Sequence, residues 1–286
     1  MADMKELPLF TVSIRNYAHN VFEAGSGTPM LFVHGSVADL RTFSASISRL
    51  HTSFRCIAYS RRFHPPNTPP APGEEYDTAA QAEEMLEIID AIQARPVIMV
   101  GSSFGAYIGL IAAIKAPGYF RALVLCEPPI VPLLLHHRDG KALHDDFVRN
   151  VMERAHSQFQ EGHDTEALKT FVEGIRGQPG WFDHLFPAIR RDLLRFTEEL
   201  RCEFLSEYGR YMVEVRLETL RAIRIPTLLL GGKLSKPMFG AILDVLADSI
   251  PSAERREIPR AGHLLHLQNA GAFETAVKGF VQRYLA

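Results

Sequence analysis

Residues 99–107 read MVGSSFGAY, and this short stretch decides how the rest of the chain is interpreted. Within it, Gly101–Gly105 match the pattern G-x-S-x-G, with Ser103 at the centre. The apolar run VIMV precedes the pattern, and residues 106–116 can continue as a helix. A strand that turns sharply into a helix is the setting in which this motif presents its central serine. We therefore predict that Ser103 stands at the apex of the turn and that Ser102 points elsewhere.

Outward from this motif, short β-rich runs alternate with longer helical segments. This alternation favours an α/β fold with a mostly parallel central sheet and helices on both faces. The expected strands are 9–14, 19–23, 30–34, 55–59, 97–100, 122–126, 226–230 and 256–258, of which the first two resemble a hairpin. The expected helices are 39–50, 79–94, 106–116 and 272–284.

The alternation stops near the middle of the chain. From about residue 133 to 220, strand signals nearly vanish and helical, charged, histidine-rich segments replace them. A strand-like apolar run appears again at 225–230, IPTLLL. We therefore predict one α/β core that is interrupted by a helical insertion.

Composition limits the classes of partner and compartment. The 286 residues carry a formal net charge of −2 and no basic stripe, which argues against nucleic acid or an anionic membrane as the main partner. Residues 1–16 lack the pattern of a secretory signal, and no apolar run reaches the ~20 residues that a membrane helix needs. Three scattered cysteines, Cys56, Cys126 and Cys202, suggest reduced thiols and a cytoplasmic location. We expect a small-molecule substrate and no metal or cofactor, and the oligomeric state is not indicated.

A serine hydroxyl needs help to act as a nucleophile at neutral pH. It requires a base, a group that orients the base, and donors for the oxyanion that forms on attack. His263 is the candidate base, because it follows the last expected strand in IPRAGH, residues 258–263, and comes late in the chain. His266 is its rival.

Backbone N–H groups are the expected oxyanion donors. One belongs to Phe104, directly after the nucleophile, and the other to the loop after MLFVHG, where we choose Ser36. The alternative interpretation of His34-Gly35 is a turn that merely ends a strand.

Three motifs occur in order along the chain: MLFVHGS at 30–36, GSSFG at 101–105 and IPRAGH at 258–263. Together they resemble the α/β-hydrolase superfamily, in its serine hydrolase branch with a helical cap. The resemblance implies an α/β-hydrolase core at 1–130 and 222–286 and a cap at 131–221, although the cap segment matches no cap that we can name.

The orienting acid departs from the common pattern of this superfamily. Many members place an Asp shortly after the strand that follows the cap, but LGGKLSK at 230–236 contains no carboxylate. Asp244 falls too far along the next expected helix. The other location in the superfamily is the end of the strand before the cap, where this chain has Glu127. The resemblance therefore implies that Glu127 orients His263, and the alternative is an ion pair between Glu127 and an arginine at the cap junction.

The expected activity is hydrolysis of a carboxylic ester or lactone through a Ser103–His263–Glu127 triad and an acyl-enzyme. Carbon–carbon bond hydrolysis or lyase chemistry on the same triad is one alternative, and a non-enzymatic ligand sensor with this fold is another. Arg61 and Arg62 follow an expected strand and could hold a substrate carboxylate, but we favour ion pairs with surface acids.

Overall fold

The computed structural model describes residues 8–285, so the expectation about a missing signal segment falls partly outside the described residues. Within that range, eight strands form one sheet in the order β1-β2-β4-β3-β5-β6-β7-β8. β1 and β2 pair antiparallel, as does β2 with β4, and the remaining pairs are parallel. The strands are β1 (Phe10–Ile14), β2 (Tyr17–Ala24), β3 (Pro29–Val33), β4 (Arg55–Tyr59), β5 (Val97–Ser102), β6 (Phe120–Cys126), β7 (Thr227–Gly232) and β8 (Ala253–Ile258). The predicted fold class is confirmed.

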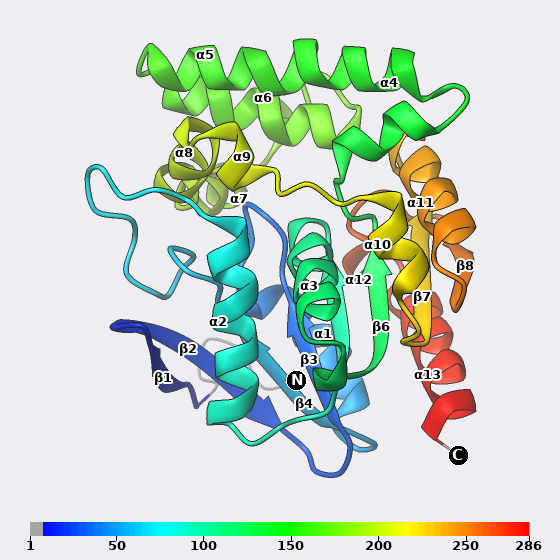
Figure 1. Cartoon of the computed structure of the whole chain (residues 1–286). Helices are drawn as coiled ribbons and strands as arrows, with labels where there is room; N and C mark the ends of the chain where they lie inside the picture. The colour runs from blue at the N-terminus through cyan, green and yellow to red at the C-terminus, as the bar shows by residue number, and fades with distance from the viewer. Residues whose placement is uncertain (1–7, 286) are drawn as a thin grey trace.

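Helices cover both faces of this sheet (Figure 1). Outside residues 131–221 they are α1 (Ser44–Leu50), α2 (Thr78–Ala91), α3 (Phe104–Lys115), α11 (Pro237–Ser249), α12 (Leu265–Gln268) and α13 (Ala270–Leu285). The Asp77 side chain caps α2 by accepting from the Ala80 N–H at 2.9 Å. No helix within residues 8–285 is both long and apolar enough to cross a bilayer.

The sheet separates two apolar clusters because successive side chains of a strand point to opposite faces. In β3, Met30 and Phe32 join the cluster beneath α1 and α13, whereas Leu31 and Val33 join the cluster beneath α2, α3 and α11. Each of these four side chains is at most 1% exposed. β3 is therefore buried on both faces, which explains its continuous apolar run.

Between β6 and β7 the described chain is helical, as predicted. Its helices are α4 (Gly140–Phe147), α5 (Arg154–Gln160), α6 (Asp164–Arg176), α7 (Pro187–Leu194), α8 (Thr197–Leu205), α9 (Tyr208–Tyr211) and α10 (Leu217–Ala222). Figure 1 shows α4, α5 and α6 together above the sheet, beyond the arrowhead of β6. We call residues 131–221 the insertion; its boundaries as a separate domain stay a prediction.

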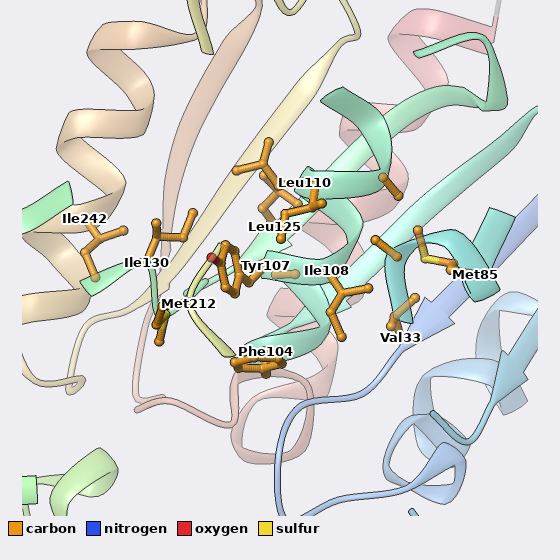
Figure 2. Close-up of a cluster of buried hydrophobic side chains, with 14 of the residues drawn as sticks. Val33, Met85, Phe104, Tyr107, Ile108, Leu110, Leu125, Ile130, Met212 and Ile242 are labelled. Carbon is orange, nitrogen blue, oxygen red and sulfur yellow. The ribbon is translucent and has the colours of Figure 1, made fainter. Parts of the chain in front are cut away.

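The insertion packs directly on the helix that follows the G-x-S-x-G motif. The Phe104 ring of α3 stacks on the Tyr211 ring with centroids 5.3 Å apart, and the Tyr107 hydroxyl donates to the Val213 carbonyl. Figure 2 shows Phe104, Tyr107 and Met212 within one apolar cluster. The insertion and the sheet therefore share a hydrophobic core.

The parallel strands end at a common edge. Val33 pairs with Gly101, Cys126 pairs with both Ser102 and Leu230, and Gly232 pairs with Ile258. The loops that follow these carboxyl ends carry the residues singled out above. Such an edge is where open α/β sheets bind ligands.

Candidate functional site

The turn between β5 and α3 holds Ser103 in an unusual backbone conformation. Its φ of 53° and ψ of −122° lie outside the regions that L-residues commonly adopt. The Ser103 N–H donates to the Cys126 carbonyl at 2.8 Å, and the Ser103 carbonyl accepts from the Ala106 N–H at 2.9 Å. These bonds fix the sharp turn to β6 on one side and to α3 on the other. Ser102 ends β5, is 3% exposed and borders the same cavity as Ser103, so the expectation that its side chain points elsewhere stays a prediction.

Two glycines make this turn possible because each faces backbone at very short range. A Cβ at Gly105 would lie 2.2 Å from the Val33 carbonyl oxygen, and one at Gly101 would lie 2.5 Å from the Ala106 Cα. Real Cβ atoms essentially never approach backbone so closely. The glycines of the motif therefore serve the close packing of α3 on β3 and β5.

Glu127 and His263 meet at the same edge of the sheet. The Glu127 Oε2 lies 2.7 Å from the His263 Nδ1, and the Glu127 Oε1 accepts from the Gly232 N–H at 2.6 Å. Both side chains are buried, with 1% and 7% exposure respectively. The carboxylate is thus engaged through both oxygens, and its partner is the imidazole rather than an arginine.

The His263 ring is held by stacking as well as by this hydrogen bond. It lies parallel to the Phe239 ring of α11, with centroids 4.3 Å apart. With Nδ1 directed at Glu127, the Nε2 atom is the one that can serve a neighbouring hydroxyl. The ring is therefore held with its Nδ1 on Glu127 and one face against Phe239; its role as a general base stays a prediction.

His263 and Ser103 line one cavity of about 570 Å³, which we call the Ser103 cavity. The core contributes the loop after β3 and the turn after β5, and the insertion contributes α6, Trp181 and the stretch around Phe196. The side chains of Ser103 and His263 form no hydrogen bond in the described structure. Such catalytic contacts commonly tighten only when substrate is bound.

The two expected oxyanion donors flank Ser103. Phe104 is the first residue of α3, where a backbone N–H has no partner within the helix. Ser36 lines the Ser103 cavity, and its neighbour Gly35 lies so close to Ser103 that a Cβ there would stand 2.9 Å from the Ser103 Cβ. The direction of both N–H groups toward a bound oxyanion stays a prediction.

The rival residues are engaged elsewhere. His266 borders the cavity, but it is buried, lies 3.1 Å from the Thr42 hydroxyl through Nε2, and burial lowers its pKa to about 3. Asp244 is on α11 and pairs with Arg255. Neither side chain contacts Ser103 or Glu127.

The prediction that Arg61 forms an ion pair with a surface acid is wrong. Arg61 is 1% exposed, and its guanidinium donates to the Tyr76 hydroxyl and, at 2.8 Å, to the Gln81 amide oxygen. Arg62 does pair with an acid, Glu84, although that carboxylate is itself buried. Arg61 therefore holds the loop after β4 to α2 instead of binding substrate.

The structure also reveals a buried charged cluster that sequence reasoning missed. Glu199 and Glu203, one turn apart on α8, point from the insertion into the core and are at most 1% exposed. Glu203 accepts from the Ser36 hydroxyl at 3.0 and 2.9 Å, and Glu199 lies 2.8 Å from the His64 Nε2. This cluster connects the insertion to the loop that carries the expected oxyanion donor.

Burial dominates the titration of this cluster. It raises the pKa of Glu199 to about 7 and the pKa of Glu203 well above the ordinary range, the latter with a contribution from the charge of Glu199. It also holds the pKa of His64 well below its ordinary value, with Arg61 contributing. The i, i+4 spacing of the two glutamates was the available signal in the sequence, but it indicates only a shared helix face.

Comparisons with known proteins identify the family of this chain. Residues 28–270 match the family described as alpha/beta hydrolase fold. The chain belongs to the α/β-hydrolase family. A solved hydrolase from Pseudomonas aeruginosa PA01 matches 96% of this chain and 98% of its own, with a TM-score of 0.76 and 20% identity.

Two curated relatives add named activities of their own. A 2-(acetamidomethylene)succinate hydrolase from Mesorhizobium japonicum is 34% identical over 116 residues, 41% of either protein. The chain thus spans less than half the length of that relative. The sn-1-specific diacylglycerol lipase ABHD11 of Danio rerio is 23% identical over 95% of this chain and 84% of its own. Together with the family match, they indicate a hydrolase.

Proposed function

We propose that this α/β-hydrolase cleaves a carboxylic ester or lactone, with Ser103 as nucleophile, His263 as general base and Glu127 as the group that orients the base. The observation that carries the proposal is the Glu127 carboxylate, which is hydrogen-bonded through both oxygens and lies 2.7 Å from the His263 Nδ1. His263 in turn lines the same cavity as Ser103, whose backbone is strained. Three chain segments, each ending a different strand, supply these groups.

In the proposed reaction, the Ser103 Oγ bonds to the acyl carbon and its proton passes to the His263 Nε2. The backbone N–H groups of Ser36 and Phe104 stabilise the oxyanion. The proton then passes to the leaving alcohol oxygen as the acyl–oxygen bond breaks, and water releases the acyl group by the reverse path. Glu127 holds the imidazole in one tautomer and stabilises its cation.

The insertion would act as a cap in this scheme. Its Phe171, Trp181 and Phe196 line the Ser103 cavity and present apolar surface to a bound substrate. Such a wall limits the access of water and determines which acyl and alcohol groups fit. For the protein as a whole, we propose a location in the cytoplasm.

The test compares the wild-type protein with the Ser103→Ala variant on a panel of p-nitrophenyl esters and lactones. We expect the wild type to turn over at least one of them and the variant to be inactive while its thermal unfolding is unchanged. Turnover that survives in Ser103→Ala would refute the assignment of the nucleophile.

A second candidate, cleavage of a bond other than an ester on the same triad, has one observation in its favour. The Mesorhizobium relative is named for a substrate whose name contains no ester. Product analysis separates the candidates, because ester hydrolysis yields an acid and an alcohol, whereas cleavage of a carbon–carbon bond does not. A ligand sensor would show no multiple turnover at all.

A further inference from the structure

Arg176 is a cation on the wall of the Ser103 cavity that the proposed mechanism does not use. It is the last residue of α6, and its guanidinium carbon lies 4.0 Å from the centroid of the Trp181 ring. Its neighbours on the same helix that line the cavity are apolar: Phe171, Val172 and Ile175. The charge is therefore displayed in a largely apolar part of the cavity.

This guanidinium has no anionic partner among the described residues. No carboxylate lies within salt-bridge distance, the side chain donates no hydrogen bond, and its Nε is buried without a partner. Burial alone lowers the pKa of Arg176. A partly buried cation without a counter-charge is costly unless something else supplies the missing acceptor.

The other charged groups of the cavity wall do not supply it. Asp39 is held by Arg41, whose Nε donates to it at 2.9 Å. Asp192 and Arg195 are exposed, so water screens their charges. Among the described residues, Arg176 is thus a partly buried cation on the cavity wall that has no hydrogen-bonding partner, whereas Arg195 is exposed to water.

We propose that the substrate carries a carboxylate, and that Arg176 binds it while Ser103 attacks the scissile carbonyl elsewhere in the same molecule; this rests on the proposed function. A planar guanidinium matches a carboxylate with two parallel hydrogen bonds. One cation against apolar walls balances a single negative charge, which favours a carboxylate over a phosphate dianion. A cavity of about 570 Å³ holds a small ester with a short chain between its two ends.

The experiment uses pairs of esters that differ only by a carboxylate in place of a methyl group. Monoethyl glutarate against ethyl pentanoate places the charge on the acyl side, and 4-acetoxybutanoate against butyl acetate places it on the alcohol side. The readout is the ratio of kcat/KM for the charged over the uncharged ester. In the wild type we expect this ratio to favour the charged ester about tenfold or more in at least one pair.

Variants of three arginines locate the effect. Arg176→Gln should remove the preference, Arg176→Lys should retain part of it because the charge remains, and Arg191→Gln should leave it intact. Arg191 is the matched control, since it is exposed on α7 and does not line the cavity. Thermal unfolding verifies that each variant is folded.

Two results would overturn the proposal: a wild type that shows no preference for the charged ester in either pair, or an Arg176→Gln variant that keeps this preference. So would loss of the preference in Arg195→Gln with Arg176→Gln unaffected.

A binding measurement separates this inference from the proposed function. Calorimetry on Ser103→Ala with monoethyl glutarate and with ethyl pentanoate tests the carboxylate site without any turnover. Tighter binding of the charged ester that disappears in the Arg176→Gln, Ser103→Ala double variant supports the site even if no ester is hydrolysed. Equal binding of both esters contradicts it, even if uncharged esters are hydrolysed by Ser103.

Discussion

Glu127 shows how one residue can be fixed by its surroundings before any chemistry occurs. Its φ of 47° is in the left-handed region, and two prolines follow it, so the backbone bends away from β6 at this residue. Its N–H donates to the Leu230 carbonyl at 3.1 Å, and its side chain reaches Gly232 and His263. The end of β6 and the end of β7 therefore hold one carboxylate between them.

Replacing this carboxylate by an amide tests its role. Glu127→Gln keeps the volume but removes the charge and favours the wrong imidazole tautomer, so we expect kcat to fall by about 10³- to 10⁴-fold. Steady-state kinetics on the best ester of the panel measures the loss. Asp244→Asn is the matched control, because Asp244 lies after β7 but pairs with Arg255, and its kcat should stay close to that of the wild type. A large loss of kcat in Asp244→Asn, with little loss in Glu127→Gln, would show that Asp244 on α11 orients the base instead of Glu127.

At the residue scale, the sequence could predict groups whose roles depend on local backbone but not groups whose roles depend on distant partners. One turn contains Ser103, Gly101 and Gly105, so a pattern of five residues was enough to predict it. The burial of Glu199 depends on His64 and Arg61, which lie more than a hundred residues earlier. Charged side chains usually lie at the surface, so nothing local predicted that these would be buried.

At the scale of elements, α8 connects the insertion to the loop after β3 through its two buried glutamates. Because the pKa of Glu199 is about 7 in the folded protein, above that of a glutamate in an unfolded chain, the folded state retains a proton that the unfolded chain releases. The stabilisation is complete below the unfolded pKa. This contribution of Glu199 to the free energy of unfolding is lost as the pH rises toward about 7, and amounts to on the order of 3 kcal/mol.

Glu199→Gln should flatten this pH dependence, because the amide stays neutral throughout. We expect the free energy of unfolding to fall less between pH 5 and pH 8 in the variant than in the wild type. Urea denaturation at a series of pH values measures it. The control is Glu198→Gln, an exposed neighbour on the same helix, which should reproduce the wild-type slope. An unchanged slope in Glu199→Gln would show that this carboxyl does not titrate in that window.

Element boundaries were predicted best where the apolar pattern is continuous. The strand at Arg55–Tyr59 matches its prediction, whereas β8 begins at Ala253 instead of residue 256. β8 is an edge strand with partly exposed Glu and Arg side chains, so its first half carries no apolar signal. The helix expected at 39–50 is divided into a 3-10 turn, Leu40–Phe43, and α1, and the Asp39 side chain caps that turn by accepting from the Arg41 N–H.

At the scale of the whole molecule, the shared hydrophobic core predicts that the insertion and the sheet unfold together. The chain has a single tryptophan, Trp181, and it lies in the insertion, so its fluorescence reports that part alone. Far-ultraviolet circular dichroism reports the whole chain. We expect the two signals to give the same midpoint in urea, as in a cooperative transition. A tryptophan transition at lower urea would show that the insertion is an independent unit.

The strands along the chain, their mostly parallel sheet and the helical character of the insertion could be predicted from residue patterns and motifs, but the walls of the Ser103 cavity could not. Which side chains of α6 face Ser103 depends on how the insertion packs over the sheet edge, and Arg176 and Trp181 carry no local signal of that packing. The proposal of a carboxylate-bearing substrate therefore rests on the folded chain and not on a sequence pattern.

The most direct measurement for the central claim is the site and rate of covalent labelling by diethyl p-nitrophenyl phosphate, read by tandem mass spectrometry of the peptide around residues 99–107. We expect one diethylphosphoryl group on the Ser103 oxygen of the wild type, and much slower labelling when His263 is replaced by alanine. A label on Ser102, no label at all, or an equal rate in His263→Ala would contradict it.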